Sequence, residues 1–357
     1  MNTIVSRILL FSSLLLLFSC RSVGPKSVVR DRNAYLNAVS DSWKNQQLLN
    51  IVKMRYADAP VFLDVSSITN QYEISGAVSA GIALEQKGVG WNPSINGTGT
   101  FTDRPTITYS PLSGQKFAMN LMKPISPAII ISLVYSGYPI DLLFKLTLNS
   151  INGMKNSSGS NGKQQPASPG FHEILEAMRA LQNENGMDFV LEKTGTADER
   201  ILIQVVENSD SLLGAKVKRL NQILNLPPGN TRFRIGTGIH RSDSLQIALS
   251  TRSILALLGE IASTIDVPVE HLDARMTYAT PCFEMQNGLP EKPFVNIHST
   301  KTPPVNPFIS VLYNNYWFYI AMDDFSSKQI FSHIMMLNSL VEVGDPKSAP
   351  IITIPTR

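Results

Sequence analysis

Cysteine and charged residues are both scarce in this chain. It has two cysteines, Cys20 and Cys282, and 17% of its residues are charged. Two distant cysteines cannot supply the paired Cys-x-x-Cys motifs of structural zinc sites. We therefore expect no metal site and no cofactor.

No run of basic residues is long enough to bind a nucleic acid backbone. The net charge of +3 is spread thinly, and the densest basic segment is 216–219. Nucleic-acid-binding proteins concentrate lysine and arginine on one face or along one helix. We predict that nucleic acid is not a partner.

Catalytic motifs are also lacking. The sequence has no G-x-S-x-G nucleophile elbow and no H-E-x-x-H zinc helix, and its five histidines are scattered. The tightest polar cluster is 236–243, where a turn could bring His240, Arg241 and Asp243 together, as in a cell-envelope hydrolase. A solvated loop explains the same residues. We predict a protein that is not an enzyme and assign no catalytic residue.

The N-terminus carries a long apolar segment that follows a basic residue and ends at a cysteine. Arg7 precedes the apolar run Ile8–Phe18, and small Ser19 precedes Cys20. This is the layout of an export signal, and the run is too short to span a bilayer. An ordinary buried helix is the alternative.

Residues 17–20, Leu-Phe-Ser-Cys, resemble the lipobox of bacterial lipoproteins, although Phe18 is bulkier than usual. The resemblance implies cleavage before Cys20 and acylation of its sulfur and new amino group. Arg21 stands where an Asp would imply inner-membrane retention, so in a two-membrane bacterium the resemblance implies the outer membrane. Once Cys20 is acylated, Cys282 has no partner for an internal disulfide.

Composition shifts divide the chain. We predict a signal peptide at 1–19, a lipidated tether at 20–33 and a domain with a helix and a β-hairpin at 34–153. A Ser/Gly/Asn/Gln-rich flexible linker follows at 154–170, and a second domain at 171–357. Helices and strands mix in both domains, which predicts an α+β fold.

Strict alternation marks 72–84. Apolar or small residues alternate there with small or polar ones, and a second alternating run follows at 94–101. The two runs can pair as a long hairpin with Trp91 near its tip. The residues that define this hairpin are Tyr72, Ile74, Val78, Ile82, Leu84, Trp91, Ile95 and Phe101.

Two interpretations of the hairpin stay open. Strands of about ten residues suit a tilted membrane crossing, so several subunits could each lend a hairpin to a shared barrel, forming an oligomeric outer-membrane pore. Alternation is also typical of soluble sheets, and the apolar side is weak where glycine replaces larger residues.

The remaining patterns are local. The apolar stretch 128–148 predicts two buried helices that break at Ser136–Pro139, with Gly153 as their final stop. Residues 309–313 and 316–321 predict a hairpin with an Asn314-Asn315 turn, followed by a helix capped by Asp323 or Asp324.

Three segments, DSWKNQQLLNIVKMRYADAPVFLDV, RPTITYSPLSG and SGYPIDLLF, resemble uncharacterised lipoproteins of Gram-negative bacteria. That family has no assigned activity, so the resemblance implies location and no mechanism. We predict a non-enzymatic outer-membrane lipoprotein on the periplasmic side. It would act as an envelope scaffold or assembly factor, with the membrane, other envelope proteins or further copies of itself as partners.

Overall fold

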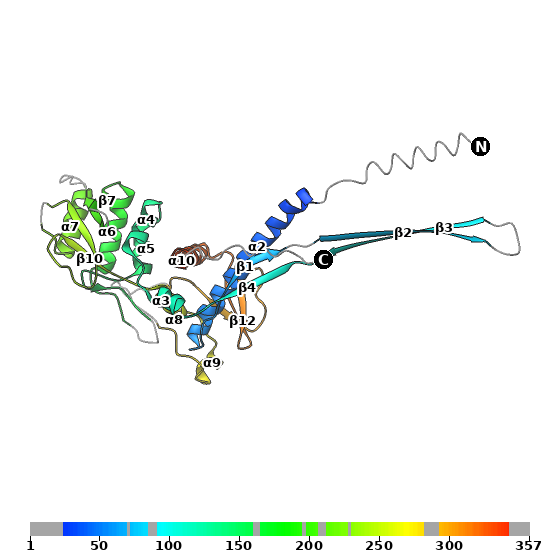
Figure 1. Ribbon diagram of the computed structural model, residues 1–357. Helices are drawn as coiled ribbons and strands as arrows, with labels where there is room; N and C mark the ends of the chain where they lie inside the picture. The colour runs from blue at the N-terminus through cyan, green and yellow to red at the C-terminus, as the bar shows by residue number, and fades with distance from the viewer. Residues whose placement is uncertain are drawn as a thin grey trace. The chain divides into compact units, whose positions relative to one another are not determined.

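The structure is a computed structural model that describes residues 24–69, 72–84, 91–159, 165–194, 198–205, 212–227, 230–281 and 293–342. Helices and mixed sheets are both present, which confirms the predicted α+β class (Figure 1). The chain divides into two units, residues 1–47 and residues 48–357. None of the helices in the described ranges is long and apolar enough to cross a membrane.

The first described helix is α2 (Gly24–Arg55). Residues 24–33 of the predicted tether are therefore helical, and Pro25 does not prevent this because proline is tolerated in the first turn. Cys20 and the predicted signal peptide lie outside the described residues. Leu48 and Val52, near the end of α2, are buried.

Four strands follow α2. They are β1 (Phe62–Thr69), β2 (Tyr72–Leu84), β3 (Trp91–Asp103) and β4 (Thr106–Leu112). β2 pairs with β3 and β1 pairs with β4, both antiparallel. The predicted long hairpin is therefore present.

Three helices come next: α3 (Gln115–Met122), α4 (Pro127–Tyr135) and α5 (Ile140–Thr147). The predicted break between α4 and α5 is confirmed, with Gly137 at φ +90° and Pro139 at the start of α5. The prediction that helix continues to Gly153 is wrong, because Leu148–Ile151 forms strand β5.

A six-stranded sheet forms the centre of the second unit. Its strands are β5, β6 (Met154–Lys155), β7 (Met187–Thr194), β8 (Asp198–Val205), β9 (Arg232–Thr237) and β10 (Gln246–Thr251), in the order β6-β5-β10-β9-β8-β7. Only β9 and β10 are parallel among the described pairs. Helices α6 (Phe171–Asn183) and α7 (Leu212–Ile223) lie in the connections. One sheet thus takes strands from both sides of 154–170.

The described part of the predicted linker is tied into the fold. Asn156 and Ser157 are only 4% and 6% exposed, and Ser158 and Gln165 exchange two backbone hydrogen bonds of 2.8 Å. Glu260 accepts from the Ser158 hydroxyl at 2.5 Å and from the Gly159 amide at 2.9 Å. The flexible linker was inferred from polar composition, but Asn156 and Ser157 are buried because Asn156 donates to the Lys145 carbonyl and the Ser157 carbonyl accepts from Arg252.

The C-terminal part contains α8 (Ile254–Ser263), α9 (Val269–Asp273), β11 (His298–Thr300), β12 (Ile309–Tyr313), β13 (Tyr316–Ile320) and α10 (Phe325–Glu342). The predicted hairpin and helix are confirmed. Asn314 and Asn315 have φ of 46° and 65°, and Asp324 accepts from the Ser327 amide at 3.0 Å.

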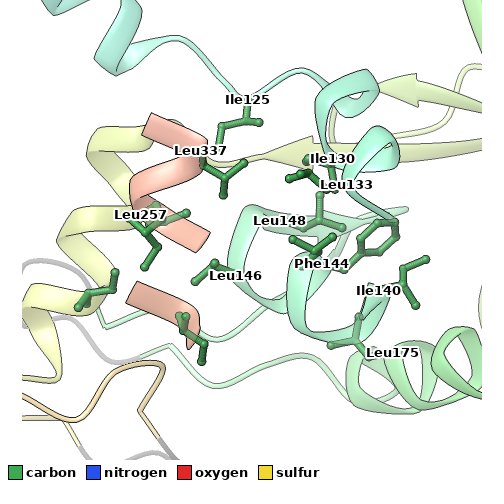
Figure 2. Close-up of a cluster of buried hydrophobic side chains, with 14 of the residues drawn as sticks. Ile125, Ile130, Leu133, Ile140, Phe144, Leu146, Leu148, Leu175, Leu257 and Leu337 are labelled. Carbon is green, nitrogen blue, oxygen red and sulfur yellow. The ribbon is translucent and has the colours of Figure 1, made fainter. Parts of the chain in front are cut away.

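The hydrophobic core joins helices that are far apart in the sequence. Ile130 of α4, Phe144 of α5 and Leu337 of α10 belong to one buried cluster, which Figure 2 shows together with Leu175 of α6 and Leu257 of α8. Burying each such side chain contributes about 2 kcal/mol. The helices on either side of the predicted linker therefore share one core.

Candidate functional site: a two-stranded ribbon

Strands β1 to β4 form two successive antiparallel pairs, β1 with β4 and β2 with β3, which we together call the ribbon. Ser67 lies opposite Thr108, and Leu84 lies opposite Trp91, so the two pairs share one offset between Ser67 and Leu84. β2 and β3 alone contribute 13 residues each. Globular proteins mostly use strands of five or six residues, so this pairing is unusually long.

The base of the ribbon is fixed to the fold. The Asn50 side chain donates to the Val61 carbonyl at 2.8 Å and accepts from the Val61 amide at 2.9 Å. Phe62 is buried, and its ring meets that of Phe117 edge-on at 5.4 Å. The last turn of α2 and helix α3 thus hold the point where the ribbon begins.

A β-bulge at Ser66 changes which residues of β1 share a face. The register shifts between Val65 and Ser67, and the Ser66 hydroxyl donates to the Thr108 carbonyl at 3.1 Å. A bulge places one extra residue in a strand, so the residues on either side of it can keep the same face. Val65 and Ile68 therefore lie on one face, although they are three positions apart.

The register separates apolar from polar positions along β2 and β3. Opposed residues share a face, and the face alternates with each step along the strand. The pairs on the first face are Ile74–Phe101, Gly76–Gly99, Val78–Gly97, Ala80–Ile95, Ile82–Pro93 and Leu84–Trp91. The pairs on the second face are Glu73–Thr102, Ser75–Thr100, Ala77–Thr98, Ser79–Asn96, Gly81–Ser94 and Ala83–Asn92.

All eight residues that the sequence singled out in this region lie in this register. Seven of them occupy the first face in the pairs named above, and Tyr72, opposite Asp103, begins the same row. The first face continues into β1 and β4, where Leu63, Ile107 and Tyr109 are 44%, 43% and 55% exposed. Apolar residues thus occupy this face in both strand pairs, with Asp103 between the two groups.

Neither long edge of the ribbon pairs with a third strand in the part of the chain that the structure describes. Each edge therefore presents a row of backbone amides and carbonyls that can pair with another strand. A two-stranded ribbon is marginally stable in water by itself. Ser75, Ala77 and Thr98 of the second face are also exposed.

In the possible catalytic cluster at 236–243, Arg241 and Asp243 each have a partner outside the cluster. Asp243 forms an ion pair with Arg234, and Arg241 donates to the Asn225 carbonyl at 2.5 Å. The Ser242 amide and hydroxyl both donate to Gln246, at 2.6 and 2.7 Å. These polar groups therefore bond to the loop itself and to adjacent segments, as in a structural turn.

A second cluster of titratable groups was not expected from the sequence. The Tyr56 hydroxyl lies 2.6 Å from Nδ1 of buried His271, whose ring also meets Tyr316 edge-on at 4.9 Å. Burial raises the pKa of Tyr56, so the phenol stays protonated and can donate a hydrogen bond to Nδ1. The Tyr313 hydroxyl donates to Asp58 at 3.1 Å nearby.

This aromatic cluster joins the segment after α2 to α9 and to the β12–β13 hairpin. Tyr56 and His271 are 215 positions apart and Asp58 and Tyr313 are 255 apart, which is why no sequence motif could reveal the cluster. Within the described ranges, no group of three or more His, Cys, Asp or Glu residues is arranged to hold a metal ion.

No protein-family model matches this chain, and no curated protein or solved structure is detectably similar to it. The resemblance to envelope lipoproteins therefore stays a prediction. The ribbon is the candidate functional site because, in the described chain, neither of its edges pairs with a third strand.

Proposed function

We propose that this protein is a non-enzymatic envelope lipoprotein that is held at the outer membrane by lipid on Cys20 and assembles with copies of itself through the ribbon. The observation that carries the proposal is that, among the strands the structure describes, neither edge of the ribbon pairs with a third strand. The assembled protein would act as a scaffold, and other envelope proteins could dock on it.

Lipid on Cys20 would supply the location. Each buried methylene contributes about 0.8 kcal/mol, and two or more acyl chains hold a protein at a bilayer stably. Anchoring confines the copies to one surface and so raises their effective concentration, which favours association between neighbours.

Strand pairing would supply the assembly. A neighbouring ribbon added to either edge satisfies the exposed backbone groups, as in other complexes formed by strand addition. Because every copy carries the same two edges, one contact can repeat from copy to copy. The contacts of Arg241 with Asn225 and of Asp243 with Arg234 support a role without catalysis.

A shortened ribbon tests assembly. A symmetric deletion removes the nine register pairs from Gly76–Gly99 to Leu84–Trp91 and leaves the offset of the remaining strands unchanged. We expect the lipidated full-length protein to be oligomeric in detergent by light scattering and the shortened variant to be monomeric. Circular dichroism should show that the rest of the fold is kept.

The anchor is tested in the shortened variant, so that the hairpin cannot itself hold the protein at the bilayer. Adding Cys20→Ala should move this variant from the membrane fraction to the supernatant. Continued membrane binding of this variant would refute anchoring through Cys20. A monomeric full-length protein would refute assembly through the ribbon.

A further inference from the structure

The hairpin has an uncharged window that is long enough to cross a bilayer. Residues 74–84 and 91–102 contain no Asp, Glu, Lys or Arg. Glu73, Asp103 and Arg104 stand at one end of this window, and Glu85 and Lys87 follow it at the other. Charged residues therefore bound the window on both sides.

The length of the window matches the apolar thickness of a membrane. Eleven residues at about 3.3 Å each extend about 36 Å, and a tilt of about 40° reduces the height to about 28 Å. The hydrocarbon core of a bilayer is about 30 Å thick, and spanning strands use about 9–11 residues. Trp91, at the end of the window, has the residue type that is enriched at membrane interfaces.

The two faces differ in the way that a spanning sheet requires. The face with Ile74, Val78 and Ile82 is apolar, and the opposite face carries Ser75, Ser79 and Thr98. A soluble sheet buries its apolar face on a core, but here each strand has only the other as partner in the described chain. In β1 and β4, Leu63, Ile107 and Tyr109 of the apolar face are exposed, and Val65 and Ile68 are half-buried.

A single hairpin cannot stay in a bilayer, because its edge amides and carbonyls would be unsatisfied in hydrocarbon. Neighbouring copies remove this cost if their hairpins close into a ring of strands. The smallest spanning rings have about eight strands and a water-filled lumen needs about 16, which corresponds to about four and about eight copies.

We propose that residues 74–84 and 91–102 of several copies form a closed sheet that spans the membrane and encloses an aqueous pore. The apolar face contacts lipid and the hydroxyl-rich face lines the lumen. This inference rests on the proposed assembly through the ribbon and adds to it a second function, the passage of small polar solutes.

Two substitutions at neighbouring positions test which face meets lipid. Val78→Asp places a charge on the apolar face near the middle of the window, and Ser79→Asp places the same charge on the polar face. A charge at mid-membrane on the lipid face is strongly destabilising, whereas lumen charges tune selectivity. Val78→Thr is the uncharged control of similar shape.

The assay measures single-channel conductance of the lipidated full-length protein in planar bilayers of phosphatidylethanolamine and phosphatidylglycerol. We expect discrete steps for the unchanged protein and for Val78→Thr. Ser79→Asp should conduct with a greater preference for cations. Val78→Asp should reduce the number of channels at least tenfold while its oligomer in detergent keeps its size.

The outcomes separate the pore from the assembly. An oligomer that never conducts would overturn the pore and leave the proposed scaffold intact. Equal loss of conductance in Val78→Asp and Ser79→Asp would overturn the assignment of the faces, and so would full conductance in Val78→Asp. A monomer in detergent would remove the assembly and the pore together.

Discussion

We expect that replacing Arg252 lowers the free energy of unfolding of the second unit. Its guanidinium is buried and donates to the carbonyls of Lys145 and Leu146 at 3.1 and 3.0 Å, and to that of Ser157 at 2.7 Å. These bonds tie the end of α5 to the segment after β6. Charge-assisted hydrogen bonds contribute about 1.5–3 kcal/mol each.

The size of the effect follows from the acceptors that lose a donor. The Lys145 carbonyl also accepts from Asn156 at 2.7 Å, so Arg252→Met chiefly affects Leu146 and Ser157. Losing the donor of a buried carbonyl costs about 1–3 kcal/mol, and methionine keeps most of the packing. We expect Arg252→Met to lower the free energy of unfolding by about 3–4 kcal/mol.

Urea unfolding followed by circular dichroism measures this difference. Arg219→Met is the matched control, because Arg219 pairs with Glu173 at 2.8 Å but its side chain is 58% exposed. An exposed ion pair contributes at most about 1 kcal/mol. If Arg252→Met and Arg219→Met changed stability equally, the assignment of Arg252 as a buried clamp would be refuted.

Three further predictions concern single sites. Burial tends to raise the pKa of Asp324, but hydrogen bonds from Ser327 lower it below its ordinary value overall. Asp324→Ala should therefore cost about 1 kcal/mol at pH 7 in urea unfolding, and the difference should vanish as the pH falls through the lowered pKa. Hydrogen bonds, chiefly the one from Lys301, lower the pKa of Glu270 to about 2, and NMR titration should show this pKa rise in Lys301→Met; an unchanged value would contradict this. Asn315→Val should destabilise by about 1–2 kcal/mol because valine tolerates positive φ poorly, whereas Asn315→Gly should unfold at the same urea concentration as the unchanged protein.

The elements that the sequence predicts correctly are those whose causes are local. The break between α4 and α5 follows from Gly137 and Pro139, and the β12–β13 turn follows from two asparagines that accept positive φ. The β2–β3 pairing follows from alternation alone, because the two runs are adjacent in sequence. In each case the information lies within about 30 residues.

The features that sequence reasoning missed depend on distant partners. The segment Leu148–Ile151 continues an apolar helical pattern, but pairing with β10 makes it a strand. A short apolar run has similar propensities for helix and strand, so its pairing with distant residues decides which of the two it forms. The polar segment after β6 becomes buried only through Arg252 and Glu260, and Tyr56 meets His271 only in the folded chain.

The bond from Arg252 to Leu146 joins positions that are 106 residues apart. A growing polypeptide must therefore reach Arg252 before α5 obtains this stabilisation, while the ribbon has already emerged with both edges open. Folding of the second unit is then expected to finish late in synthesis. Truncated products that end before Arg252 should be insoluble or rapidly degraded, since their ribbon edges can pair with other chains while the second unit is still unfolded.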